Sequence, residues 1–215
     1  MSMEKLQDQA LRADIYLLIA SLIRQQPNAE LLSWLSELET SDSQDEMSKA
    51  WSTLKQSAKT ISAEQISDEY QNLFIGIGRG EVVPFASWHL TGSLMEKPLA
   101  AIRQDLLKLG FERNEHTKEP EDHIAALCEV MAMLNESPLE TQREFFNAHI
   151  ASWQHKIVNQ IESAKSARFY LSVASLMKAF FNYEQVSFVE APVSMKPVNK
   201  IEIKNIVDTE VNPSH

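Results

Sequence analysis

The sequence contains a single cysteine, Cys128, among its 215 residues. One cysteine cannot close an intramolecular disulfide, so the chain suits a reducing compartment. Cys128 falls on an apolar helical stripe, which favours a buried and inert thiol. The six histidines form neither a His-x-x-x-His pair nor the HExxH signature of a helical zinc site. The sequence therefore predicts no metal site.

Basic residues are also few. Lys and Arg number 20 against 30 Asp and Glu, which gives a formal net charge of −10. Proteins that bind nucleic acid displace counterions with clustered Lys and Arg, and the sequence has no such cluster. Anionic lipid is disfavoured for the same reason. The acidic excess favours a cationic partner and argues against a nucleic acid.

Long apolar runs are missing as well. The apolar segment near the N-terminus, residues 15–23, is short, contains Ser21 and follows Glu4, Asp8 and Asp14. A membrane-spanning helix needs about 20 apolar residues, and a secretory signal begins with positive charge. Because neither pattern is present, we expect a cytoplasmic protein without stable membrane insertion.

Glycine is scarce, and all five glycines lie between residues 76 and 110. Since glycine costs a helix about 1 kcal/mol relative to alanine, the glycine-free stretches on both sides favour helices. Apolar residues recur there at helical spacing. The pattern predicts an all-α protein, with helices near residues 4–25, 29–38, 47–58, 62–74, 87–95, 98–109, 121–134, 139–149, 152–161 and 167–183.

A polar segment that ends at Pro120 is the best internal boundary. It divides the chain into an N-terminal helical part, residues 1–115, a hinge, residues 116–122, and a C-terminal helical part, residues 123–185. Beyond these, residues 186–215 carry three prolines and several β-branched residues without helical periodicity. We expect an extended tail there. The two helical parts form one compact domain unless two chains exchange them.

Three glycines alternate in the loop that follows the predicted helix at 62–74. A phosphate-binding P-loop needs a preceding strand and Lys-Ser/Thr after its last glycine, and a dinucleotide fingerprint has the spacing G-x-G-x-x-G. Here a helix precedes the loop and the spacing is G-x-G-x-G. A tight interhelical turn is therefore the better interpretation.

Two further segments carry candidate chemistry. Pro84 to His89 places aromatic residues beside the glycine loop, as in the wall of an apolar groove or in plain core. Glu121 and Asp122 are expected in the first turn of a helix, where carboxylates favour the helix dipole. Adjacent helical residues do not face each other, so Asp122 and His123 do not suggest an acid–base dyad with each other, and a dyad with a residue of another element stays open. No set of nucleophile, base and orienting group is apparent, and we predict no catalytic residues.

Five motifs in a fixed order resemble the TorD/DmsD family of redox-enzyme maturation chaperones. They are E-Y-x-x-L-F-x-G-x-G-x-G at 69–80, P-F-x-S-W at 84–88, P-L-A-x-I-R at 98–103, L-G-F at 109–111 and E-P-E-D-H-I-A-x-L at 119–127. The resemblance implies a compact all-α bundle. It also implies a chaperone, not an enzyme, that binds the twin-arginine signal peptide and the apo form of a molybdenum-cofactor oxidoreductase. Such a chaperone delays export until the cofactor is inserted.

The resemblance also implies which residues bind the signal peptide. Arginine prefers planar, bidentate carboxylate contacts, so paired arginines followed by an apolar stretch call for carboxylates beside an apolar groove. Because the peptide must leave again, we expect exposed charges and a partly open groove. The expected peptide-binding residues are Leu73, Phe74, Pro84, Ser87, Trp88, Asp122 and His123. Further acidic contacts are expected from Glu69, Glu81 and Glu121, with a structural role for Glu69 left open.

Other expectations follow from the same resemblance. It implies no tightly bound cofactor, weak guanine nucleotide binding, and either a monomer or a domain-swapped dimer. The client enzyme stays open. An assembly chaperone of a non-exported redox enzyme, of the nitrate-reductase type, is the main alternative. A nucleotide- or metal-dependent hydrolase is a more distant one.

Overall fold

The structure is a computed structural model that describes residues 3–76, 79–113 and 119–190. Within these residues the regular elements are all helical, so the predicted all-α fold is confirmed. A π-helical turn, η1 (Gln71–Ile75), extends α4, and a 3-10 turn, η2 (Leu134–Glu136), extends α7. The ten α-helices of the described ranges are α1 (Met3–Arg24), α2 (Ala29–Glu37), α3 (Glu46–Thr60), α4 (Ala63–Tyr70), α5 (Ala86–Thr91), α6 (Lys97–Lys108), α7 (Ile124–Met133), α8 (Leu139–His149), α9 (Gln154–Ser163) and α10 (Phe169–Glu190).

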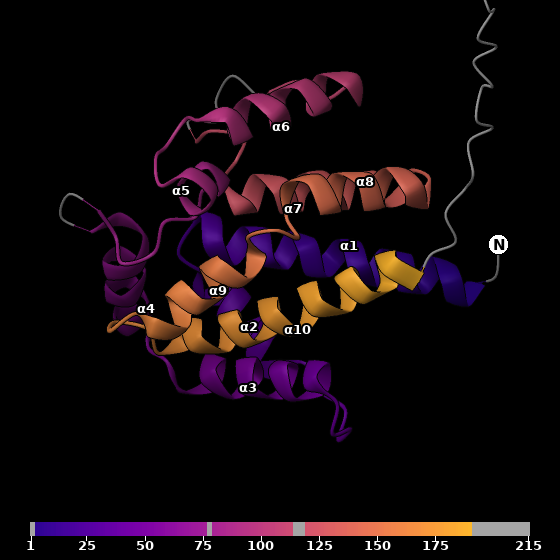
Figure 1. Cartoon of the computed structure of the whole chain (residues 1–215). Coiled ribbons are helices and arrows are strands. Elements are labelled where there is room, and N and C mark those ends of the chain that lie inside the picture. Colours follow the sequence, from indigo (N-terminus) through magenta and orange to yellow (C-terminus); the bar gives the residue numbers. More distant parts are fainter. Residues whose placement is uncertain (1–2, 77–78, 114–118, 191–215) are drawn as a thin grey trace, which may run out of the picture.

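Helix α1 runs through the middle of the bundle (Figure 1), where it packs mainly against α7. Helix α10 packs against α3 and α9, and α2 packs against α3. The apolar stripe of α1, including Tyr16, Ile19 and Leu22, is fully buried. Tyr16 meets Phe180 of α10 edge-on, with ring centroids 4.7 Å apart. Each buried side chain of this size contributes about 1.5–3 kcal/mol, so this contact region stabilises the whole fold.

A buried ion pair fixes α1 against α10. The Arg12 guanidinium donates two hydrogen bonds of 2.7 Å to the Glu184 carboxylate, and the Tyr16 hydroxyl donates a third of 2.8 Å. Arg12 also donates to Gln142 of α8 at 3.1 Å. Removing one partner of a buried pair leaves an unpaired charge, at a cost of about 3–5 kcal/mol. The network therefore specifies how three helices meet.

The last helix is longer than predicted. Residues 186–190, expected to begin an extended tail, continue α10. The reason is a contact at Phe188: its ring lies 5.2 Å from the Phe146 ring and 5.3 Å from the Arg12 guanidinium carbon. The remainder of the predicted tail, residues 191–215, lies outside the described residues, as do residues 114–118 of the predicted boundary and hinge region. Among the described helices, none is both long enough and apolar enough to cross a bilayer.

Candidate functional site

The segments around Pro84 and Asp122 are joined edge to edge. Ala86 N–H donates to the Asp122 carbonyl at 2.9 Å, and Ile124 N–H donates to the Pro84 carbonyl at 2.8 Å. These bonds form an isolated antiparallel bridge between Phe85 and His123. We call residues 84–87 together with 122–124 the junction. It lies where α5 and α7 both begin, and it brings four of the predicted peptide-binding residues together, namely Pro84, Ser87, Asp122 and His123.

Asp122 is buried within the junction, with 1% of its surface exposed. Its Oδ2 accepts a hydrogen bond of 2.9 Å from Ser87 N–H. Neither Asp122 Oδ1 nor Ser87 Oγ has a hydrogen-bond partner, although both atoms are buried. The expectation of an exposed charge is therefore wrong for Asp122, because the bridge places it inside. An unpaired carboxylate oxygen and hydroxyl in an apolar setting are costly, and a polar group that reached them would be strongly favoured.

Helix α7 starts later than predicted. Glu121 and Asp122 do not lie in its first turn, because the backbone at residues 122–124 is engaged in the bridge and the helix begins at Ile124. His123 is the N-cap, and its Nδ1 accepts a hydrogen bond of 3.1 Å from Ala125 N–H. Burial, and to a lesser degree the nearby Arg24 charge, lowers the pKa of His123 to about 3. The ring is therefore neutral at pH 7 and acts as a cap, not as half of a dyad with Asp122.

The predicted aromatic residues divide into two groups. Phe74 of η1 is half-buried, with its ring centroid 5.2 Å from that of Tyr70 and 5.1 Å from that of Tyr170. Trp88 of α5 is also half-buried, but its ring faces the Arg79 guanidinium at 4.6 Å. The two rings thus have different partners. Leu73, the neighbour of Phe74, is completely buried, and its carbonyl accepts from Val82 N–H at 2.8 Å.

The glycine loop makes a tight return from η1. Gly76 has a φ of +57°, a conformation that favours glycine, and a side chain at Gly80 would collide with the Leu73 carbonyl. Glu81 N–H and Val82 N–H donate back to the carbonyls of Asn72 and Leu73. The interpretation as a tight turn thus holds for residue 76 and residues 79–82; residues 77–78 lie outside the described ranges. Weak guanine nucleotide binding stays a prediction.

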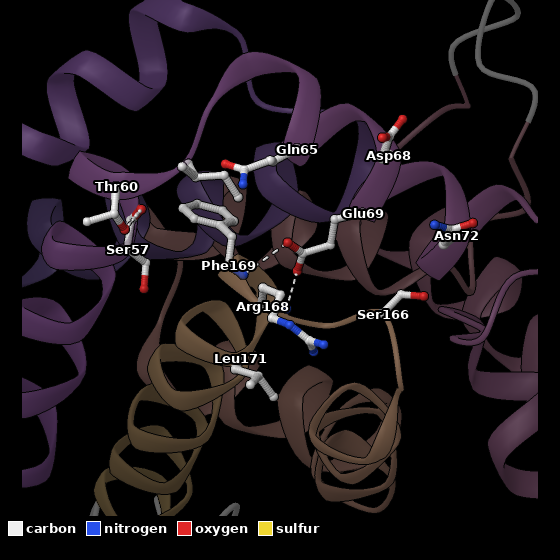
Figure 2. A pocket seen from close by; sticks show the side chains of 11 residues that line it. Ser57, Thr60, Gln65, Asp68, Glu69, Asn72, Ser166, Arg168, Phe169 and Leu171 are labelled. Atoms are coloured by element: carbon white, nitrogen blue, oxygen red, sulfur yellow. Dashed lines mark hydrogen bonds between the residues drawn. The ribbon is translucent and has the colours of Figure 1, made fainter.

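Glu69 is a helix cap supplied from a distant part of the chain. Its carboxylate accepts from the backbone N–H groups of Arg168, Phe169 and Tyr170 at 2.7, 3.0 and 2.8 Å. Figure 2 shows Glu69 of α4 pointing at the start of α10, at the edge of a cavity of about 610 Å³. The sequence before α10 has no Ser, Thr, Asp or Asn at position 168. That missing local cap is compatible with a cap from another segment, but it does not identify Glu69.

Glu81 binds the segment that links α9 to α10. It is exposed, and it accepts from Lys165 N–H at 2.6 Å, from Ser166 N–H at 3.4 Å and from the Ser166 hydroxyl. The hydrogen bond from the Ser166 side chain is the main cause of a pKa of Glu81 below its ordinary value. Two of the three predicted acidic contacts are thus engaged in holding the segment that links α9 to α10.

Glu121 lines a cavity of about 560 Å³ between α6 and α7, which we call the α6–α7 groove. Arg103 Nε donates to Glu121 Oε2 at 3.0 Å, Arg103 Nη2 lies 2.9 Å from the same oxygen, and Arg113 lies 3.8 Å from the carboxylate. Partial burial raises the pKa of Glu121, but the hydrogen bond and the two positive charges outweigh it, so the pKa lies below its ordinary value. Neither Phe74, Trp88 nor Asp122 lines this groove or the 610 Å³ cavity.

The described residues were considered for metal ligands and for a reactive thiol. Within residues 3–76, 79–113 and 119–190, no three His, Cys, Asp or Glu side chains are grouped so that they could hold a metal ion. Cys128 is fully buried, as predicted, and burial raises the pKa of its thiol well above the ordinary value.

The chain is similar to a known protein family and to a solved structure. A family model described as the nitrate reductase delta subunit matches residues 40–159. The chain belongs to this TorD-like family. A solved structure from Archaeoglobus fulgidus, described as a candidate redox enzyme maturation protein, superposes with a TM-score of 0.54 at 20% identity. That match covers 81% of this chain and 93% of the other and shows a shared fold.

Individual relatives carry the names TorD and DmsD. The chaperone protein TorD of Vibrio atlanticus (strain LGP32) is 28% identical over 130 residues, or 54% of this chain. TorD of Actinobacillus pleuropneumoniae serotype 3 is 24% identical over 163 residues, or 73% of this chain and 79% of the relative. DmsD of Haemophilus influenzae, named for Tat proofreading, is 27% identical over 115 residues, or 53% of this chain and 57% of the relative. The chain aligns with only 60% of the length of the Vibrio relatives. The resemblance to the TorD/DmsD family is confirmed.

Proposed function

We propose that this protein is a cytoplasmic maturation chaperone for a molybdenum-cofactor oxidoreductase. It binds the twin-arginine signal peptide and the apo form of that enzyme, and it delays export until the cofactor is inserted. The observation that carries the proposal is membership of the TorD-like family, in which relatives are named chaperones and one is named for Tat proofreading. Binding, not catalysis, is the activity.

The surface near Trp88 suits an arginine. The exposed guanidinium of Arg79 lies 4.6 Å from the Trp88 ring, and an arginine of a client peptide can stack in the same way. Such a contact contributes about 0.5–2 kcal/mol. The net charge of −10 attracts a cationic leader from a distance. A few contacts of this size give micromolar affinity.

The junction supplies polar contacts in this proposal. Ser87 Oγ and Asp122 Oδ1 are buried and unpartnered, so a donor group of the peptide would pair with an acceptor that has no partner in the free protein. Reaching them requires the junction to open locally, because Asp122 is held by Ser87 N–H. Local opening is common in segments that bind ligands. It also keeps binding reversible, as release for export demands.

Calorimetry with synthetic peptides tests the proposal. A peptide with two adjacent arginines before an apolar stretch is expected to bind with a Kd near micromolar, and a two-lysine version about tenfold more weakly, because lysine lacks the planar fork of donors. Trp88→Ala is expected to weaken the arginine peptide about tenfold, whereas Trp34→Ala, an exposed tryptophan on α2, leaves it unchanged. Equal affinity for the two peptides would show that the chain does not recognise twin-arginine leaders.

A second candidate function is assembly of a redox enzyme that is not exported. The description of the matching family as a nitrate reductase subunit favours it. In that case the protein binds a region of the mature enzyme without a leader. Co-purification with an enzyme whose leader has been deleted is the expected outcome, and loss of co-purification on deletion would favour the first function.

A further inference from the structure

The α6–α7 groove combines charged and apolar side chains in one cavity of about 560 Å³. It is lined by residues of α6 and α7, by the segments between them and by Arg24 of α1, and Figure 1 shows α6 at the upper edge of the bundle. The apolar lining includes Leu107, 76% exposed, and Met133, 55% exposed. Large apolar side chains that are this exposed within one groove mark an interaction surface.

The charges of the groove favour a cationic occupant. Four glutamates and three arginines line it, so the carboxylates are in excess. The resident arginines are paired with these carboxylates: Arg24 with Glu129 at 2.7 Å and with Glu119 at 3.7 Å, and Arg103 with Glu121 at 2.9 Å. An anionic partner would meet the excess of negative charge and would have to break these pairs.

The resident ion pairs can be exchanged at low cost. The Arg24 and Arg103 side chains keep 23% and 50% of their surface exposed, and ion pairs open to solvent contribute little net stability. An incoming guanidinium can take the bidentate position on Glu129, or the place of Arg103 on Glu121, while the resident arginine turns into water. No carboxylate is left unpaired in the exchange, and the planar carboxylate geometry selects arginine over lysine.

We propose that the α6–α7 groove binds a peptide segment in which arginines precede apolar side chains. The arginines replace Arg24 and Arg103 on Glu129 and Glu121, and the apolar side chains cover Leu107 and Met133. Methionine adapts its shape to varied apolar partners, so the groove tolerates different client sequences. This proposal rests on the proposed function and adds a site, which shares no lining residue with the junction, for the same class of partner.

The test uses the full chain and a synthetic peptide with two arginines followed by leucines. Glu121→Gln combined with Glu129→Gln, and separately Leu107→Ser, are each expected to raise the Kd about tenfold in calorimetry. The matched controls are Glu162→Gln, which removes an ion-paired carboxylate elsewhere, and Val186→Ser, which removes an exposed apolar side chain of α10. Both controls keep the wild-type Kd. A photoreactive residue at position 107 crosslinks to the peptide, and one at position 186 does not.

Two outcomes overturn the proposal in distinguishable ways. If the wild-type protein binds the arginine peptide but the groove variants bind it equally well and position 107 gives no crosslink, the groove is not the site and the proposed function stands. If the wild-type protein does not prefer the arginine peptide to its lysine version, the proposed function fails. The proposal that such a peptide occupies the groove then fails as well. A cooperative unfolding transition of each variant shows that the fold is intact in either case.

Discussion

Glu121 and Asp122 are neighbours in sequence but belong to regions with opposite properties. Glu121 faces the α6–α7 groove, where it holds two arginines in exchangeable ion pairs. Asp122 faces the junction, where it is buried and holds the start of α5 through Ser87 N–H. A turn closed by the hydrogen bond from His123 N–H to the Pro120 carbonyl separates the two side chains. The difference teaches that a run of carboxylates does not reveal which of them a ligand can reach.

The largest expected effect is at the junction. Asp122→Ala removes the acceptor of Ser87 N–H and leaves that buried donor unpaired, so we expect a loss of about 2 kcal/mol in unfolding free energy. The protein stays folded, since domains of this kind are stable by about 5–15 kcal/mol. Urea unfolding measures the loss. Asp122→Asn keeps an acceptor oxygen and should lose clearly less; equal losses would mean that the hydrogen bond does not hold the junction.

The pH dependence of stability comes next. The folded pKa of His123 is about 3, against an ordinary 6.5, so the unfolded chain binds more protons between these values. The contribution of His123 to stability is fully present above pH 6.5 and is lost as the pH drops toward 3. Between pH 7 and pH 5 the loss is about 2 kcal/mol. His123→Asn retains a capping side chain for α7 and removes this contribution. The urea midpoint of the wild-type protein should therefore fall more between pH 7 and pH 5 than that of His123→Asn. Equal falls would contradict the burial of a neutral ring.

A smaller effect, of opposite sign, is expected at Ser87. Its hydroxyl is buried without a partner, and removing such a group relieves a desolvation cost. Ser87→Ala should raise the unfolding free energy by about 1 kcal/mol while weakening peptide binding, the usual trade between stability and function. Thermal unfolding and calorimetry report the two effects. A destabilised Ser87→Ala protein would show that the hydroxyl supports the fold.

The smallest effect is expected in the groove. Glu121→Gln breaks ion pairs with two half-exposed arginines, and such pairs contribute about 0.5 kcal/mol. The loss should shrink further in 1 M salt, where charges are screened within about 3 Å. Urea unfolding at low and high salt measures it. A loss as large as that of Asp122→Ala would erase the distinction between the two regions.

Much of the fold could be predicted because helices are specified locally. The predicted helix at 139–149 coincides with α8, and the capping box of Ser62 and Gln65 is formed with bonds of 3.2 and 2.9 Å. Capping and amphipathic spacing involve residues three or four apart. The late start of α7 and the extra turn of α10 escaped prediction, because the junction and the packing of Phe188 decide them.

The sequence by itself determined the helices, the tight turn at the glycines, the burial of Cys128 and the family. Only the tertiary structure decided which carboxylates are free to meet a partner. Glu69 caps backbone groups 100 residues away, Asp122 binds a residue 35 positions away, and Glu121 pairs with an arginine 18 positions away. The role of a carboxylate depends on which groups donate hydrogen bonds to it, and for these three carboxylates the donors belong to other, distant segments of the chain.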